Sequence, residues 1–171
     1  MCQILDIDSK YTVAEEDITF YKVLQVLEVH GETKFVLPFM GSYVEVGHTY
    51  EEPDQKEFTI GHVRSPYNLP SGYTTTGHWI YLGTTTDTYS AGFYYRCIAE
   101  GGFHLFQTEG DAKSFMLDAS GGNSVFKLFR AIVPKGTAYI DGYYDASGLK
   151  LRTVCAKKVR YEFMEARRHR K

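Results

Sequence analysis

The segment Glu100–Gly122, EGGFHLFQTEGDAKSFMLDASGG, carries the clearest folding signals in the chain. It begins with a short apolar run, Phe103–Phe106, in which alternate residues point to opposite faces of a strand. Thr108 can cap the helix that follows, and Asp111 offers a carboxylate to its first turn. Before two glycines end the pattern, apolar residues recur at the spacing of one helix face: Ala112, Phe115, Met116 and Ala119. The segment therefore predicts a strand followed by one amphipathic helix over residues 109–119.

Strand signals dominate the rest of the chain, on both sides of this segment. The 14 Tyr and 11 Phe residues, against a single Trp, favour strands, in which flat rings pack on a pleated surface. Residues 20–29 and 34–39 are apolar runs joined by the turn signal HGET, which predicts a hairpin. Residues 125–133 are apolar on both faces and predict a central strand covered on both sides. Residues 149–163 follow a period of two, and predict one long strand or two strands with a bend near Lys157.

These patterns predict a single β-rich α+β domain over residues 1–165. We expect a mostly antiparallel, strongly twisted sheet or partial barrel that carries one main helix. Residues 166–171 form a basic C-terminal tail: the formal net charge of −2 divides into +4 on residues 167–171 and −6 on the rest. An acidic body of this kind excludes a general nucleic-acid binder, which would show a broad basic face. For the tail we favour a solvated terminus over an electrostatic contact with nucleic acid or an acidic partner.

The apolar runs and the cysteines indicate the cellular compartment. No run reaches the roughly 18 apolar residues that span a bilayer, and the N-terminus shows no secretory signal. The three cysteines, Cys2, Cys97 and Cys155, are odd in number and widely spaced, which argues against a disulfide framework. Cys97 and Cys155 lie in apolar strand patterns, where we expect inert core thiols. The sequence thus predicts a cytoplasmic protein without membrane contact.

Four short segments match the motifs of one protein group. They are YKVL (Tyr21–Leu24), a segment with recurring glycine and tyrosine (Gly41–Tyr50), GFHLF (Gly102–Phe106) and PKGTAYIDG (Pro134–Gly142). In this order they resemble a group of uncharacterised proteins from gut bacteria and their phages, whereas residues 53–89 match less well. The resemblance spans most of the chain and brings no known activity with it. It implies a bacterial protein of accessory-gene or prophage origin.

His104 is the first candidate for a functional side chain. At the end of a strand and beside a helix N-terminus, its imidazole would serve as a switchable base. The structural alternative is a half-buried ring that packs by Phe106 and forms a hydrogen bond with a nearby backbone group. We favour the structural alternative, because every other part of the segment also has a structural reason.

The order of strand, helix and strand from the GFHLF run onward also resembles the middle of the ADP-ribosyltransferase fold. This resemblance implies an enzyme, or a degenerate enzyme, that binds NAD. The residues at the matching positions are Tyr21 and Lys22 for the polar group on an early strand, Tyr94 or Tyr95 for the stacking ring, and Glu162 for the late acid. The chain departs from the family pattern, since YKV lacks the Arg–Gly of the usual YRG and no Glu-x-Glu follows. We therefore keep this enzyme as the alternative hypothesis.

The segment 64–77, RSPYNLPSGYTTTG, is rich in proline and glycine and predicts a long surface loop. Arginine, tyrosine and tryptophan are typical of binding hot spots, and four such residues gather in or just beyond this loop: Arg64, Tyr67, Tyr73 and Trp79. We interpret them as candidate ligand-binding residues. The alternative is a solvent-exposed connection with incidental aromatic residues.

Motifs for metal binding or catalysis are weak in this chain. No metal-ligand spacing links the histidines His48, His62, His78 and His104. We find no phosphate-binding loop and no nucleophile motif. The sequence therefore predicts a small cytoplasmic binding or interaction protein without a catalytic centre, cofactor or metal. Its partner would be a protein or a small molecule rather than nucleic acid.

Overall fold

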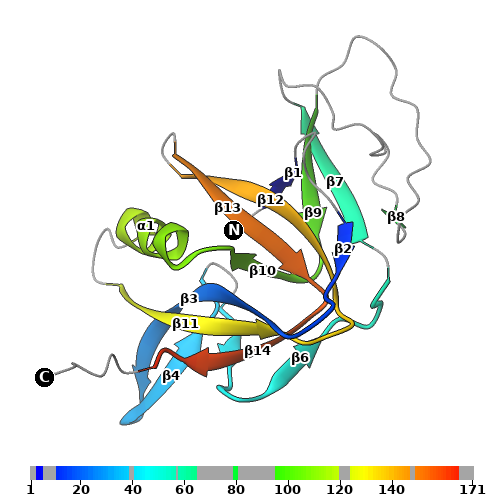
Figure 1. The fold of residues 1–171 in the computed structure, drawn as a ribbon. Coiled ribbons are helices and arrows are strands. Elements are labelled where there is room, and N and C mark those ends of the chain that lie inside the picture. The colour runs from blue at the N-terminus through cyan, green and yellow to red at the C-terminus, as the bar shows by residue number, and fades with distance from the viewer. Residues whose placement is uncertain are drawn as a thin grey trace, which may run out of the picture.

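The computed structural model of the chain describes residues 3–5, 11–38, 41–56, 58–64, 79–80, 95–119, 124–146 and 149–165. Within these residues, 14 strands form one sheet and one helix packs on it (Figure 1). The first eight strands are β1 (Gln3–Leu5), β2 (Tyr11–Val13), β3 (Ile18–Val29), β4 (Glu32–Val36), β5 (Tyr43–Val44), β6 (Thr49–Glu51), β7 (Phe58–Arg64) and β8 (Trp79–Ile80). They are followed by β9 (Tyr95–Glu100), β10 (Phe103–Phe106), α1 (Glu109–Ala119), β11 (Val125–Val133), β12 (Ala138–Ala146), β13 (Leu149–Ala156) and β14 (Lys158–Phe163).

The strand pairings among the described residues are all antiparallel. The order is β6-β14-β11-β3-β10-β13-β12-β1-β9-β7-β8, while β2 pairs with β12 and β4 pairs with both β3 and β5. The predicted β-rich α+β fold, with a mostly antiparallel sheet and one main helix over residues 109–119, is confirmed. In the part of the chain that the structure describes, no helix has the length and apolar character needed to cross a bilayer.

The strand β7 was not expected from the sequence. Its sequence, FTIGHVR, has a glycine and a histidine in the middle, which weaken the strand pattern. Six residues of β7 nevertheless pair with β9, from Thr59 opposite Glu100 to Arg64 opposite Tyr95. Pairing with a distant segment therefore decides the conformation here, and Arg64 ends a strand rather than belonging to the predicted loop.

The strand β3 positions the candidate site, because three strands share its two edges. One edge pairs with β11 from Ile18 to Val26. The other edge is divided, since β10 pairs with it at Tyr21 and β4 pairs with it from Gln25 onward. β10 and β4 therefore pair with the same edge of β3 on either side of residues 22–24, and the two strands diverge from each other there.

The sheet curls because a series of neighbouring strands that starts at β11 leads back to β11. The strands β11, β3, β10 and β13 are successive neighbours, and β13 leads into β14, which pairs with β11 again. The chain turns this corner at Lys157, so the second of the two predicted alternatives, two strands with a bend, is confirmed. The Lys157 backbone N donates to Ala138 O at 3.0 Å, and its carbonyl O accepts from Glu52 N at 2.9 Å. Two distant segments thus hold the corner.

Among the described residues, two apolar cores lie on opposite faces of this curled sheet. The first core includes Phe20, Leu24, Leu105, Phe129, Val154 and Tyr161. The second, which we call the helix-side core, includes Val23, Phe106, Ala112, Phe115, Leu128 and Leu151. Neighbouring positions of β3 enter different cores, because successive side chains of a strand point to opposite faces.

The helix α1 is placed by its cap and by its apolar stripe. Thr108 Oγ1 accepts a hydrogen bond from Asp111 N at 3.0 Å, which confirms the predicted cap. Ala112 and Phe115 are buried in the helix-side core, so the predicted stripe faces the sheet. The helix contacts β3, β10, β11 and β13 and lies beside the open end of the curl between β13 and β11 (Figure 1).

Candidate functional site

A cavity of about 250 Å³ lies where β4 and β10 separate from β3. We call it the Lys22 pocket; its lining residues are Lys22, Leu37, Pro38, Glu52, Gly101, Gly102, Phe103, His104 and Tyr161. Lys22 and His104 are candidates from the sequence, and the cavity brings them together. The other residues come from distant parts of the chain, so the cavity is a product of the tertiary fold rather than of a local motif.

Lys22 is a buried cation in the wall of this cavity. It shares a face of β3 with Phe20 and Leu24, both members of the first core. Its Nζ donates a hydrogen bond to His104 O at 2.8 Å. Burial lowers the pKa of Lys22 from 10.5 to about 8, so most of the amine is still protonated at pH 7. Among the described residues, no carboxylate forms an ion pair with Lys22.

The Gly101–Gly102 turn forms another wall of the Lys22 pocket. Both residues have positive φ angles, +74° and +83°, which favour glycine. The turn also approaches β13 closely, since a Cβ on Gly102 would lie 2.8 Å from Cys155 Sγ. The backbone N of Gly102 donates to Glu52 Oε1 at 3.1 Å. The turn therefore holds a carboxylate in the same cavity as the buried ammonium.

Cys155 is a structural thiol beneath this turn. Its Sγ donates to Gly101 O at 2.9 Å. Burial raises the pKa of Cys155 to about 12, although the nearby Lys157 acts in the opposite direction. Because the thiolate is the nucleophilic form, Cys155 is unsuited to covalent chemistry near neutral pH. The prediction of a buried core thiol is confirmed for Cys155; for Cys97 the structure describes only the backbone, in β9.

The His104 ring is half-buried and held by the backbone of β1. Its Nδ1 accepts a hydrogen bond from Gln3 N at 3.3 Å, which requires an unprotonated Nδ1. Its main chain pairs with Cys155 in β13, and its carbonyl accepts from Lys22. These contacts favour the structural interpretation of His104. Its backbone carbonyl, rather than its ring, accepts the hydrogen bond from the Lys22 ammonium.

Tyr21 and Glu162 lie on the helix side of the sheet, on the face opposite Lys22. Tyr21 packs against the helix-side core and is paired across the strands with Arg130 of β11. On the other side of Arg130, Glu162 Oε2 accepts from Arg130 Nη2 at 2.9 Å. Glu162 Oε1 accepts from Arg160 Nε at 3.0 Å. The structure therefore does not bring Tyr21 and Glu162 into the Lys22 pocket.

The remaining candidates from the sequence fall largely outside the described residues. Tyr67, Tyr73 and Tyr94 lie outside them, as does the basic C-terminal tail. Arg64 and Trp79 are described as backbone in β7 and β8. The loop hypothesis stays a prediction. In the described part of the chain, no three His, Cys, Asp or Glu residues gather in a way that could hold a metal ion.

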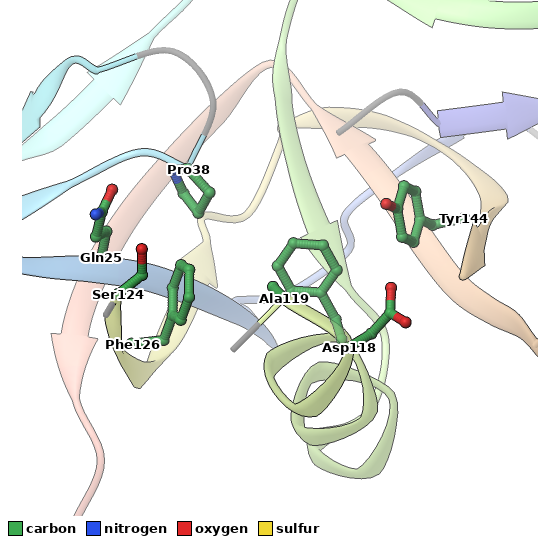
Figure 2. A pocket seen from close by; sticks show the side chains of 8 residues that line it. Gln25, Pro38, Asp118, Ala119, Ser124, Phe126 and Tyr144 are labelled. Atoms are coloured by element: carbon green, nitrogen blue, oxygen red, sulfur yellow. The ribbon is translucent and has the colours of Figure 1, made fainter. Parts of the chain in front are cut away.

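A second cavity, of about 420 Å³, lies on the helix side of the sheet (Figure 2). We call it the aromatic pocket; its lining residues are Gln25, Pro38, Phe115, Asp118, Ala119, Ser124, Phe126 and Tyr144. Pro38, which follows β4, borders both cavities. None of these residues was a candidate from the sequence.

Glu52, Gly102 and Tyr161 are members of the Lys22 pocket that the sequence did not identify. Tyr161 is fully buried, and burial raises its pKa well above the usual value, so its hydroxyl stays protonated. One signal for the pocket is present in the sequence, because Lys22 interrupts the apolar face that Phe20 and Leu24 form on β3. A lysine in such a position is a candidate for a buried cation.

Comparison of the chain with protein-family models, with curated proteins and with solved structures finds no match. The candidate site therefore rests on its own geometry.

Proposed function

We propose that this protein is a non-catalytic binding protein whose Lys22 pocket holds a small organic anion. The observation that carries the proposal is the buried Lys22 ammonium, which faces a cavity and has a carbonyl oxygen as its hydrogen-bond partner. A buried charge costs free energy unless an opposite charge compensates it. A carboxylate bound in the cavity would supply that compensation.

The shape of the cavity supports a small ligand. Its volume of about 250 Å³ is below the range of roughly 300–1,000 Å³ that is usual for drug-sized ligands. Leu37, Phe103 and Tyr161 supply apolar and aromatic surface. Glu52 adds a carboxylate, which repels a polyanion but accepts hydrogen bonds from a hydroxyl or an amine. We therefore propose a short monocarboxylate that carries one such donor group, for example a hydroxy acid.

The contacts of Cys155 and His104 support binding rather than catalysis by these two residues. Cys155 is protonated and donates to a carbonyl, and the His104 Nδ1 is occupied by a backbone N–H. An NAD-using enzyme stays the alternative hypothesis, but the residues it requires are divided between two faces: Lys22 lies on one, and Tyr21 and Glu162 lie on the other. The bacterial or phage origin and the cytoplasmic location stay predictions.

The proposal is tested by titrating the ¹⁵N-labelled protein with lactate and, separately, with lactamide, its uncharged analogue. We expect lactate to shift the amide signals of Gly101 and Gly102 in a saturable way, and lactamide to bind at least about tenfold more weakly, the loss that a missing charge-assisted hydrogen bond predicts. Lys22→Met should abolish the shifts. Lys34→Met is the matched control, because Lys34 is an exposed lysine on the neighbouring β4.

Acetate, glycine and succinate complete the panel of anions. If no member of the panel binds, or if Lys22→Met binds lactate as well as the wild type does, the proposal is wrong. Titration with NAD tests the alternative directly. Saturable NAD binding that Glu162→Ala abolishes would replace the non-catalytic assignment with the enzyme.

A further inference from the structure

The aromatic pocket is lined by aromatic rings and one acidic residue, whereas the Lys22 pocket holds a buried ammonium. The rings of Phe115, Phe126 and Tyr144 supply π-faces, which carry partial negative charge. Asp118 adds a carboxylate, and no lysine or arginine is among the lining residues that the structure describes. This combination of rings and one acid is the chemistry of a cation site.

The C-terminal end of α1 adds partial negative charge beside the aromatic pocket. Asp118 and Ala119 belong to the last turn of the helix, which has no basic residue, and the helix macrodipole places partial negative charge at this end. The Asp118 side chain is exposed, and an ionised carboxylate can accept hydrogen bonds from several donors. The helix end and the carboxylate therefore both favour a positive charge in the cavity.

The walls of the aromatic pocket are held in place by the helix-side core. Phe115 is buried, its ring lies 5.1 Å from the ring of Phe106, and the ring of Tyr144 meets it edge-on at 5.5 Å. Figure 2 shows Gln25, Ser124 and Phe126 on one side of the helix end and Tyr144 on the other. The cavity thus has an aromatic residue on each side of the helix end, and Asp118 lies on the side of Tyr144 in this view.

We propose that the aromatic pocket binds a small organic cation of the alkylammonium class, with its methyl groups against Phe126 and Tyr144 and its charge near Asp118. A methylated ammonium suits this site better than a simple ammonium ion, because the apolar surface of Pro38 and Ala119 does not replace lost hydration. This inference goes beyond the anion site and does not depend on it, since the described lining residues of the two cavities differ apart from Pro38, which borders both.

The test compares choline with 3,3-dimethylbutan-1-ol, its uncharged carbon isostere, by isothermal titration calorimetry on the full chain. We expect choline to bind about tenfold more tightly than the isostere, as cation–π contacts predict. Phe126→Leu and Asp118→Asn should each weaken choline binding by about three- to tenfold. Glu109→Gln, at the opposite end of the same helix, is the matched control and should leave choline binding unchanged.

Two further measurements keep the outcomes distinct. Lys22→Met should leave choline binding intact, which separates this inference from the proposed anion site. A peptide that contains trimethyl-lysine, titrated in parallel, distinguishes a methylated side chain from a free cation, and binding of either supports the proposal. Equal affinity for choline and its isostere, no choline binding up to tens of millimolar, or unchanged choline binding by a folded Phe126→Leu variant would overturn it.

Discussion

The two faces of β3 differ in charge and in how deeply their cavities are buried. On one face, Lys22 puts a buried ammonium into a small cavity. On the other, the strand contributes Gln25 to a larger cavity with aromatic walls and an exposed acid. Because strand side chains alternate, residues three positions apart serve sites of opposite polarity. The comparison teaches that a single curled sheet can present two chemically distinct cavities without any local motif for either.

The helix-side face depends on aromatic packing, and Phe115 is the residue that tests this most strongly. Phe115→Ala removes a buried ring that contacts Phe106 and Tyr144, and should lower the free energy of unfolding by about 3–5 kcal/mol. Leu117→Ala is the control on the same helix, because Leu117 is 77% exposed and its loss should cost less than about 0.5 kcal/mol. Urea denaturation of both variants measures the difference. Equal effects would mean that α1 is not packed on the sheet as described.

The Lys22 face depends on the close approach of the Gly101–Gly102 turn to β13. Gly102→Ala combines a positive φ angle with a Cβ 2.8 Å from Cys155 Sγ and 3.0 Å from Ala156 O, and should cost about 2–4 kcal/mol. Gly101→Ala has a similar φ angle and nothing within 4 Å of the added Cβ, so its cost should be about 1 kcal/mol. Thermal unfolding of the two variants checks the order. A milder effect at Gly102 than at Gly101 would contradict the described packing.

The charge of Lys22 should reduce stability in the absence of a ligand. Burial lowers its pKa in the folded protein to about 8, against 10.5 for an ordinary lysine. Between these two pH values the unfolded chain holds a proton that the folded protein has lost, so this group adds stability as the pH rises from about 8 to 10.5 and removes it as the pH falls. Lys22→Met has no such charge. At pH 7 it should be more stable than the wild type by about 1–3 kcal/mol.

The difference between Lys22→Met and the wild type should shrink as the pH rises through this window. Urea denaturation of both proteins at pH 7, 9 and 10.5 gives the comparison, in which the titration of other groups cancels. A gap that is constant over this range would show that Lys22 is not a buried cation.

The sequence predicted elements whose signals are local. The cap at Thr108 and the helix that follows it each depend on a few neighbouring residues, and both are confirmed. For residues 149–163 the sequence left two alternatives open, and the structure has the one with a bend near Lys157. The strand β7 was missed because its glycine and histidine disturb the alternation, while its pairing with β9 depends on a segment more than 30 residues away.

The candidate site was predicted only in part, and the reason is also physical. Lys22 and His104 were both identified as candidates, but the contact between them joins a side chain to a backbone carbonyl, which no residue pattern reveals. Glu52 and Tyr161 reach the same cavity only because β4 and β10 separate from one edge of β3. The spacing of residues along the chain does not reveal which distant strands pair, or in which register.

The titration of Lys22 itself is the measurement that tests the central claim most directly. In protein labelled with ¹³C and ¹⁵N at lysine, the Lys22 side-chain signals should report a pKa near 8, and saturating lactate should raise that pKa because a bound carboxylate stabilises the ammonium. A Lys22 pKa near 10.5 that lactate leaves unchanged would contradict both the burial of the cation and the anion site built on it.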